Sequence, residues 1–497
     1  MNEIDPLALK YAAEFSIPPA LAQIIARRFP VYEEARSFLY PSLQKLYPPN
    51  TLPDIELAAA EITESISKNL PILIYCHDDP DGYTAAAIMY KTLCDLRREN
   101  KPEIFIYAIN REKDGYVLNS AVLDEYVKKG VKTLITVDFG ISNPENFLIA
   151  QNKGLKMVIC DHHETGFIDF PIPAVDPKRK GSKYPFRELA GVGVTFKLCQ
   201  YILQKSFKLS DQDFYNIKKE FLAITMLGTI ADRVPPLNEN RIFCYEGLKA
   251  INGLKLPWTE YFLKDGSINF ARVHSEIIPV FVSAAYLDSN LGVELLVKKD
   301  YDITYRTIDE LKLIEEERRN LIEKITREAI DLSKVYEGFV VAIFPEDTSK
   351  IKLNHLGSIA SRLRDHFGRT AIVILMNSGK CFGELRSHHI DLYEMLYSMK
   401  NLFIDFGGHK RAAGFSMSEG NLDKFIEEVN RFINRHQKRE SLSNLEPEAF
   451  IDKSQINLLE PLFPFGDGNR APILTDGVVL YTIDHKFDII DLGIWRT

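Results

Sequence analysis

The sequence predicts an α/β protein with a parallel-sheet domain, a long helix, a second α/β domain and a small C-terminal β segment. Short apolar runs alternate with helix-like runs from about residue 54 to 205, as in βαβ units. Residues 305–334 contain no Gly or Pro and are dense in Glu, Lys, Arg, Leu and Ile, which indicates a solvated connecting helix. Beyond that helix, apolar strand-like runs return, which predicts a second sheet.

The chain divides into five expected parts. At 497 residues it is too long for a single hydrophobic core. We expect a helical segment over 1–50, where helix-like runs are interrupted by proline, and the parallel-sheet domain over 51–300. A connecting helix is expected over 301–335, the second α/β domain over 336–437, and a partial β-domain over 438–497.

Composition excludes several classes of protein. An apolar content of 45% and a charged content of 26% are typical of a globular chain, not a disordered one. The six cysteines are scattered without a CxxC pair, so neither a disulfide framework nor a zinc knuckle is indicated. The sequence has no signal-peptide pattern and no apolar stretch near the roughly 20 residues that span a bilayer. We therefore expect a cytoplasmic protein without a membrane partner.

Metal-ligating residue types follow four of the apolar runs. Since ligands bind beyond the C-terminal ends of parallel strands, we expect these side chains to lie along one edge of the sheet. Crowded carboxylates are costly unless a cation neutralises them, so the pattern predicts a metal site. Bound cations would also offset the net charge of −8, which otherwise disfavours nucleic acid. The residues are His77, Asp79 and Asp81 after PILIYC, Asp138 after TLITV, Asp161, His162 and His163 after KMVIC, and Asp176 after IPAV.

Several of these motifs also have a purely structural interpretation. In HDDPDG, an extended backbone would direct alternate residues toward one metal, whereas a polar strand-to-helix turn with an Asp N-cap needs no ligand. Asp138 could be a strand-end cap, and Asp232 in GTIAD could be an exposed turn residue. Two adjacent histidines after an Asp, His162 and His163, are the hardest to explain at a buried strand end without a ligand.

The segment FGGHKRAAGF is a candidate phosphate-binding turn. Its glycines precede His409, Lys410 and Arg411, and backbone N–H groups at a turn that opens a helix would bind an anion. The alternative is a glycine that ends a helix, followed by an exposed basic pair. The pair His388 and His389 is similarly ambiguous. Four solitary histidines are interpreted as structural: His274, His366, His436 and His485.

Taken together, HxDxDG, VDxG, DHH and the later GGH resemble the DHH phosphoesterase family. Longer segments are similar to its RecJ branch, the single-strand-specific 5′ exonucleases, and they occur in the RecJ order over about residues 20–480. The resemblance implies a DHH catalytic domain, a DHHA1-type second domain and an OB-like β-domain that stops short of a complete barrel. The similar segments are 109–119, 184–198, 227–241, 406–415 and 460–474.

The resemblance also implies roles for individual residues and a cofactor. The mixed Asp/His set suits two Mn²⁺ ions, with Mg²⁺ also admitted. His77 stands where bacterial RecJ usually has Asp. The implied metal ligands are His77, Asp79, Asp81, Asp138, His162 and Asp232. The implied catalytic residues are Asp81, Asp138, His162 and His163, with His163 on the scissile phosphate. The implied substrate-binding residues are His163, Arg111, Arg386, Ser387, Gly407, Gly408 and His409.

The expected activity is hydrolysis of single-stranded DNA from its 5′ end to 5′ mononucleotides, in DNA repair and recombination. A helicase and a single-strand-binding protein are the expected protein partners. The segment KLNHLGSIASRL lacks the family's WHxGVIG run, so either Asn354 and His355 replace it or the phosphate end binds differently. Two alternatives stay open: a phosphodiesterase for short oligonucleotides or cyclic dinucleotides, and a non-catalytic replication or repair scaffold. The intact set of carboxylates argues against the scaffold, which would carry their repulsion without use.

Overall fold

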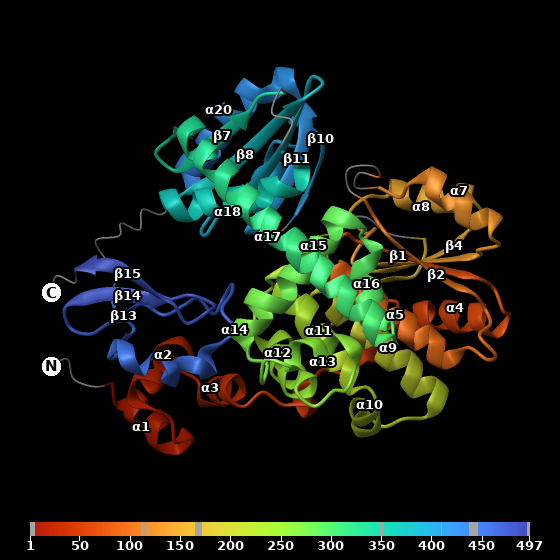
Figure 1. Ribbon diagram of the computed structural model, residues 1–497, viewed down its shortest axis with the longest axis horizontal. Helices are drawn as coiled ribbons and strands as arrows, with labels where there is room; N and C mark the ends of the chain where they lie inside the picture. The colour runs from red at the N-terminus through yellow and green to blue at the C-terminus, as the bar shows by residue number, and fades with distance from the viewer. Residues whose placement is uncertain are drawn as a thin grey trace. The chain divides into compact units, whose positions relative to one another are not determined.

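The computed structural model describes residues 5–110, 114, 117–164, 171–346, 351–408, 410–436 and 446–494 (Figure 1). The chain forms two compact units. The first comprises Met1–Lys312 with Ser443–Thr497, and the second comprises Leu313–Leu442. Among the described residues, no helix combines the length and the apolar content that crossing a membrane requires.

A five-stranded parallel sheet forms the centre of the first unit, as the alternating pattern predicts. Its strand order is β2-β1-β3-β4-β5, and all neighbouring strands run parallel. Strands β1 and β3 are buried along their whole length, which explains why they read as unbroken apolar runs. The strands are β1 (Ile72–Cys76), β2 (Ile104–Ala108), β3 (Thr133–Val137), β4 (Lys156–Cys160) and β5 (Ala174–Val175).

Helices cover both faces of this sheet (Figure 1). On one face, Leu123 and Ala150 pack in one cluster with Leu73, Leu134 and Met157 of the strands. That face carries α7 (Ser120–Lys128) and α8 (Glu145–Asn152), and the other carries α4 (Ile55–Ser67), α5 (Pro80–Leu96) and α9 (Gly191–Phe207). Because α5 and α9 follow β1 and β5, both helices begin at the edge where the strands end.

A helical layer follows the sheet and ends in the predicted connecting helix. Helix α11 is buried along most of its length because it packs against α5, α9 and α12. Helix α17 (Tyr301–Leu332) has 32 residues, which confirms the long helix expected there. The other helices of this layer are α10 (Asp211–Ile217), α11 (Lys219–Asp232), α12 (Asn238–Ile251), α13 (Pro257–Leu263), α14 (Phe270–Arg272), a π-helix (Val273–Ile277), α15 (Ile278–Leu287) and α16 (Asn290–Val297).

The two ends of the chain meet within the first unit. Arg28 forms a bidentate pair with Glu448 at 2.8 and 2.9 Å and donates to Asn469 Oδ1 at 2.8 Å. The N-terminal helices are α1 (Pro6–Phe15), α2 (Pro19–Arg28) and α3 (Tyr32–Leu39), followed by 3-10 helices at Leu43–Lys45 and Pro49–Thr51. The C-terminal segment forms one four-stranded sheet and a 3-10 helix, Lys453–Leu462. The strands are β12 (Ala449–Phe450), β13 (Leu474–Thr475), β14 (Val479–Ile483) and β15 (Ile489–Ile494).

The second unit is a six-stranded mixed sheet with helices on both faces, which confirms the second α/β domain. Its order is β10-β11-β9-β8-β7-β6; β7 and β8 are parallel and the other pairs are antiparallel. The strands are β6 (Lys334–Val335), β7 (Phe339–Phe344), β8 (Thr370–Asn377), β9 (Lys380–Arg386), β10 (Phe403–Gly408) and β11 (Ala412–Ser418). The helices are α18 (Leu353–Phe367), α19 (Leu392–Ser398), α20 (Leu422–His436) and two 3-10 helices, Lys400–Leu402 and Glu419–Asn421.

The glycine pair of FGGHKR lies in a strand, so the expected helix start is wrong, and so is the helix end weighed against it. Gly407 and Gly408 end β10 and pair with Gly414 and Ala413 of β11. Gly408 has φ +132°, and a Cβ there would lie 2.5 Å from the Ala412 carbonyl oxygen. Glycine is therefore required by close strand pairing and by the positive φ.

Candidate metal centre

The turn after β1 places its acidic residues on two different elements. Asp79 is the N-cap of α5 and accepts a hydrogen bond from Gly82 N–H at 3.0 Å, whereas Asp81 lies inside the first turn of the helix. The expected extended run through Asp81 is therefore wrong, because α5 begins at Pro80. His77 still lies close to Asp79, with Nδ1 2.9 Å from Oδ2. Asp79 therefore caps α5, as the structural interpretation predicts, and its carboxylate also lies beside His77.

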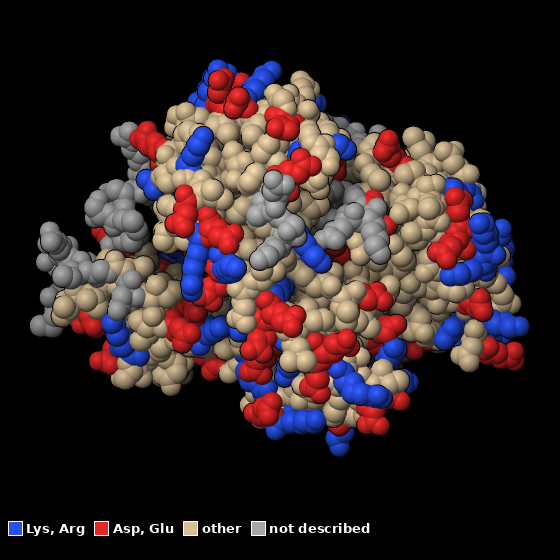
Figure 2. All heavy atoms as spheres, turned by 45° about the horizontal axis from the view of Figure 1, so that its top comes forward, with Lys and Arg blue, Asp and Glu red and all other residues tan. Residues whose placement is uncertain are grey.

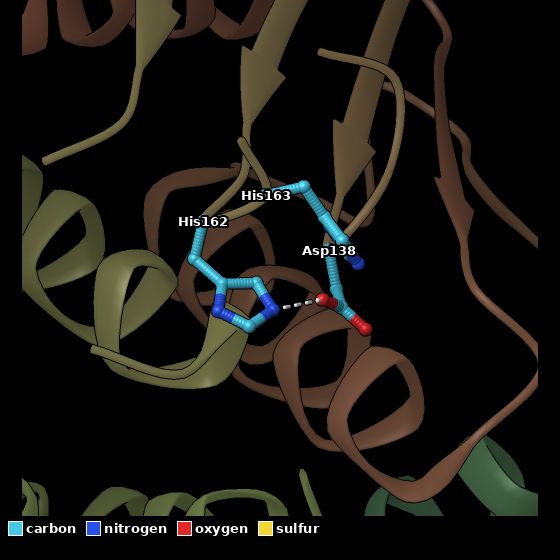
Figure 3. Close-up of side chains that lie close together, drawn as sticks. All are labelled: Asp138, His162 and His163. Atoms are coloured by element: carbon cyan, nitrogen blue, oxygen red, sulfur yellow. Dashed lines mark ion pairs between the residues drawn. The ribbon is translucent and has the colours of Figure 1, made fainter. Parts of the chain in front are cut away.

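The six residues expected as metal ligands come together at the C-terminal edge of the sheet. Their ligand atoms form groups within which all atoms lie within 4.8 Å of one another. One group is His77, Asp79 and Asp138, and another is Asp81, His162 and Asp232. Asp138 and His162 connect the two groups, since Asp138 Oδ1 lies 3.2 Å from His162 Nε2 (Figure 3). Each of the two groups could hold a cation.

His162 is positioned with the ring nitrogen Nε2 toward the carboxylates. Its Nδ1 lies 3.0 Å from the Leu189 carbonyl oxygen, which can only accept, so Nδ1 carries the proton. The lone pair of a neutral ring is then on Nε2, which lies 3.8 Å from Asp81 Oδ2 and 3.7 Å from Asp232 Oδ2. A lone pair that faces carboxylate oxygens is repulsive unless a cation lies between them. This orientation is the one that metal-ligating histidines adopt.

Asp81 is fixed by the start of α9. Its two carboxylate oxygens accept hydrogen bonds from Gly191 N–H at 2.7 Å and Val192 N–H at 2.9 Å. These are N–H groups without partners inside their own helix, and the positive end of the helix dipole favours a carboxylate there. Even so, burial and the neighbouring carboxylates of Asp232 and Asp79 raise the pKa of Asp81 well above its ordinary value.

Asp138 and Asp232 each carry a buried oxygen that makes no hydrogen bond to any described residue. These atoms are Asp138 Oδ1 and Asp232 Oδ2. Burial and the Asp81 carboxylate raise the pKa of Asp138 well above its usual range, and burial with Asp79 raises that of Asp232 to about 6. Buried carboxylate oxygens without hydrogen bonds fit metal ligands, and a bound cation would return these groups to their ionised form.

His163 belongs to the same cluster and is held by Asp161. Its Nδ1 lies 2.7 Å from Asp161 Oδ1, and Asp161 also accepts from the backbone N–H groups of His162 and Ile141 at 2.8 and 2.9 Å. Burial disfavours a charged imidazole, but the Asp161 carboxylate outweighs it and raises the pKa of His163 to about 9. His163 is therefore a candidate cationic hydrogen-bond donor at the edge of the cluster.

Three residues of this region have roles that the sequence did not indicate. Asp161 was expected among the metal-ligating side chains, but its carboxylate instead contacts His163 Nδ1 and the Ile141 N–H at the neighbouring strand end, which spacing does not reveal. Gly191 lies in the segment that supported the family resemblance, and a Cβ there would lie 2.5 Å from Asp138 Oδ1. Leu189 acts through its carbonyl group, which no side-chain pattern can indicate.

The expected phosphate-binding residues of the second unit lie around β9, β10 and α18. Arg386 Nη1 donates to Glu384 Oε2 at 2.8 Å, and its guanidinium lies against Gly357. Ser387 is buried; its hydroxyl accepts from Ile390 N–H at 3.0 Å and lies 2.8 Å from Thr370 Oγ1. Gly407 and Gly408 end β10 as described above. Arg111 and His409 lie outside the described residues.

The residues of KLNHLGSIASRL begin α18. His355 is buried, and its Nδ1 accepts the backbone N–H of Lys352 at 3.1 Å. Burial lowers the pKa of His355 to about 4, so this imidazole is neutral at pH 7. His355 therefore acts in this structure as a helix-capping residue, and its replacement of the missing WHxGVIG run stays a prediction.

Comparison with known proteins identifies two domains. Residues 71–229 match the model of the DHH family, N-terminal domain, and residues 337–435 match the DHHA1 domain. The chain therefore contains a DHH domain and a DHHA1 domain. It is 28% identical over 493 residues to the single-stranded-DNA-specific exonuclease RecJ of Bacillus subtilis. That alignment covers 94% of this chain and 60% of the relative, so the chain spans less than two thirds of that relative's length.

Solved RecJ structures share the fold of this chain. RecJ from Thermus thermophilus in complex with Mn²⁺ has a TM-score of 0.75 at 23% identity, over 98% of this chain and 72% of that chain. RecJ from the same organism in complex with Mg²⁺ has a TM-score of 0.69 at 22% identity, over 99% of this chain and 71% of that chain. The matches confirm the architecture of a DHH sheet domain followed by a DHHA1 domain.

Proposed function

We propose that this protein is a metal-dependent exonuclease that hydrolyses single-stranded DNA from its 5′ end to mononucleotides. The observation that carries the proposal is the cluster of His77, Asp79, Asp81, Asp138, His162 and Asp232, in which each of two groups could hold a cation. The Bacillus subtilis relative named as a single-stranded-DNA-specific exonuclease supports the substrate class. Roles in DNA repair and recombination, with a helicase and a single-strand-binding protein, rest on the same likeness.

The proposed cofactor is a pair of Mn²⁺ ions, with Mg²⁺ as the other candidate. His77, Asp79 and Asp138 would hold one ion, and Asp81, His162 and Asp232 would hold the other. The mixture of carboxylate and imidazole suits Mn²⁺, while the carboxylates also suit Mg²⁺. When bound, such ions supply Lewis-acid activation of a phosphodiester and neutralise the carboxylates.

The chain's own groups would orient the scissile phosphate. Water attacks phosphorus in line, the bond from phosphorus to the 3′ oxygen breaks, and the departing 3′ oxygen takes up a proton. The product is one nucleotide with a 3′ hydroxyl and a shortened strand with a 5′ phosphate. His163, whose ring is oriented by the Asp161 carboxylate 2.7 Å from its Nδ1, would donate a hydrogen bond to a non-bridging phosphate oxygen. Negative charge that develops on the phosphate would be stabilised by such a donor.

Substrate binding is proposed for Arg386 and the Gly407–Gly408 strand end in the DHHA1 domain. The guanidinium suits bidentate phosphate contact. The Ser387 hydroxyl already contacts Thr370 and Ile390 within the domain, which favours a positioning role for it. On the face drawn in Figure 2, acidic and basic side chains are intermingled, so phosphate binding would depend on local groups such as these.

The first test is cleavage of long single-stranded DNA, labelled at either end, with Mn²⁺. The proposal requires stepwise loss from the 5′ end with release of mononucleotides, and no cleavage by Asp81→Ala. The matched control is Asp95→Ala, since Asp95 lies at the other end of α5 and pairs with Lys218 away from the cluster. That variant should cleave like the wild type.

The other outcomes identify the alternatives. Rapid cleavage of di- to tetranucleotides with inert long DNA would replace the exonuclease by a short-oligonucleotide phosphodiesterase. No cleavage of either substrate, together with no Mn²⁺ binding by calorimetry, would replace it by a scaffold. Mn²⁺ binding that is lost in Asp81→Ala and kept in Asp95→Ala would support the metal centre independently of the substrate.

A further inference from the structure

Two tyrosines of α19 lie near Phe406, a partly buried residue of the strand that ends in Gly407 and Gly408. Tyr397 is 44% exposed near the end of α19, and Tyr393 lies one turn earlier in the same helix. Their rings are near parallel, with an interplanar angle of 23° and centroids 6.3 Å apart. The Tyr393 ring also lies 6.2 Å from the ring of Phe406, which directly precedes Gly407. The rings of Tyr397, Tyr393 and Phe406 follow one another in that order, from the exposed end of α19 to the residue before Gly407. These three rings are called the aromatic strip, or simply the strip.

The strip is fixed to the β10–β11 hairpin. Leu392 N–H, at the start of α19, donates to the Lys410 carbonyl oxygen at 2.9 Å. Leu392, Met395 and Leu396 are the α19 residues in the buried core cluster of this domain, as far as the described residues show. Since these three side chains pack α19 onto the core of the domain, the position of the helix does not depend on Tyr393 or Tyr397. These contacts hold α19 against the hairpin and so fix the distance between the Tyr393 and Phe406 rings.

Basic groups flank the strip. Lys400 Nζ lies over the Tyr397 ring, 4.9 Å from its centroid, in a cation–π contact that a stacked base would displace toward the phosphate, and Lys410 is exposed in the hairpin. Glu394 is exposed on the same helix, so the strip itself does not suit a phosphate group. Single-strand binding sites combine aromatic rings, on which bases stack, with flexible cationic side chains that contact the phosphate backbone.

We propose that Tyr393, Tyr397 and Phe406 form a stacking subsite for a nucleobase of single-stranded nucleic acid, with Lys400 beside the adjoining phosphate. The proposal rests on the proposed function for its substrate class and extends it from phosphate contacts to bases. The strip is continuous with the Gly407–Gly408 strand end, where phosphate binding is proposed, so both would engage one strand. Stacking tolerates every base, and the subsite confers no sequence preference.

The test is binding of the full chain to a 5′-phosphorylated 12-nucleotide DNA and to versions with one abasic position. Anisotropy in EDTA measures affinity without cleavage. Wild type should lose about 5- to 150-fold in affinity when the abasic position is at one or two adjacent sites, the range for one stacked base. Tyr393→Ala/Tyr397→Ala should bind the intact strand more weakly by a similar factor and lose this positional dependence. Tyr393→Phe/Tyr397→Phe should keep it.

The matched control is Tyr301→Ala, because Tyr301 is 42% exposed on α17. It should keep the wild-type profile. An abasic profile that is flat in wild type, or unchanged in the double Ala variant, overturns the subsite. Cleavage of the intact strand with Mn²⁺ is measured in parallel. Cleavage with a flat profile rejects the subsite alone, and a tyrosine-dependent profile without cleavage rejects the exonuclease alone. Failure to bind any strand in EDTA, together with no cleavage in Mn²⁺, rejects both.

Discussion

His162 shows how one backbone contact can orient an ordinary imidazole as a candidate metal ligand. The Leu189 carbonyl oxygen accepts from Nδ1 at 3.0 Å and leaves Nε2 as the atom that faces Asp138, Asp81 and Asp232. Burial lowers the pKa of His162 well below its usual value, so the ring stays neutral and keeps its lone pair. Desolvation, usually a cost, here maintains the protonation state that a cation requires.

Gly191 leaves no space for a side chain beside Asp138. A Cβ at this position would lie 2.5 Å from Asp138 Oδ1 and 2.7 Å from its Cβ. We expect Gly191→Ala to displace that carboxylate and to lower Mn²⁺-dependent hydrolysis by about 100-fold, the cost of a misplacement near 1 Å. The measurement is kcat/KM on labelled single-stranded DNA, with Mn²⁺ affinity by calorimetry.

The same helix offers the control for this change. The nearest atoms outside the helix backbone to a Cβ at Gly193 would be those of the Leu189 side chain, at 3.3 Å or more, which can give way by a small shift. Gly193→Ala should therefore retain most of the activity. If Gly191→Ala bound Mn²⁺ and cleaved DNA as well as Gly193→Ala does, the position of Asp138 would not limit the reaction.

At the scale of elements, the sequence was informative wherever a local pattern decides the structure. The apolar runs before His77, Asp138 and His162 predicted three strands and the edge at which their ends meet. The helix expected over 301–335 is also present, as Tyr301–Leu332, because a long stretch without Gly or Pro admits few other structures. These predictions needed only the period of apolar residues and the absence of breakers.

Elements that depend on long-range packing could not be placed in this way. The residues around Asp232 left open an exposed turn, and only the family resemblance implied a ligand. Helix α11 packs among three helices, which carries its last residue into the cluster. The segment around Gly408 has glycines that suit a helix end, a turn or a strand equally well. Its pairing with β11, which itself pairs with β9, decides between them, and such pairing is invisible to local propensity.

A buried ion pair connects α9 and α12. Lys197 Nζ lies 2.7 Å from Glu239 Oε1, with both side chains fully buried, and it also donates to the Tyr47 carbonyl oxygen at 2.7 Å. Lys197→Met would leave the Glu239 carboxylate buried without its cation, so we expect a loss of about 3–5 kcal/mol in the free energy of unfolding. Urea denaturation followed by circular dichroism measures it.

Two further variants separate the charge from the packing. Lys197→Met/Glu239→Gln removes both charges and should recover part of the stability that the single change loses. Lys249 pairs with Glu246 on the surface of α12, where the lysine side chain is 67% exposed. Lys249→Met should therefore stay within about 0.5 kcal/mol of wild type. A single Lys197→Met variant as stable as Lys249→Met would contradict the account.

At the scale of the whole molecule, the first unit is closed by contacts between its two chain ends. Arg27 and Arg28 of α2 contact the C-terminal segment, Arg28 through Glu448 and Asn469. Asn469 is fully buried and donates to the Leu462 and Pro464 carbonyl oxygens at 2.6 and 2.8 Å. Helix α2 and the C-terminal segment therefore cover each other, and the loss of either should expose the other to solvent.

Arg241, in α12, contacts both the N-terminal helices and the C-terminal segment. Its guanidinium donates to the carbonyl oxygens of Phe38 at 2.6 Å, Phe463 at 3.1 Å and Pro461 at 2.6 Å, and lies 3.4 Å above the Phe38 ring. Unsatisfied buried carbonyls cost about 1–3 kcal/mol each, so Arg241→Ala should loosen the N-terminal helices and the C-terminal segment together.

The expected result for Arg241→Ala is faster amide hydrogen exchange in both α3 and residues 447–483, with unchanged exchange in the parallel sheet. Arg272→Ala is the matched control, because Arg272 also donates to carbonyl oxygens, those of Phe262 and Gly266 at 2.8 Å, but only within its own neighbourhood. It should leave residues 447–483 protected. Faster exchange confined to one chain end in Arg241→Ala would mean that the two ends are held independently, since a shared clamp must release both.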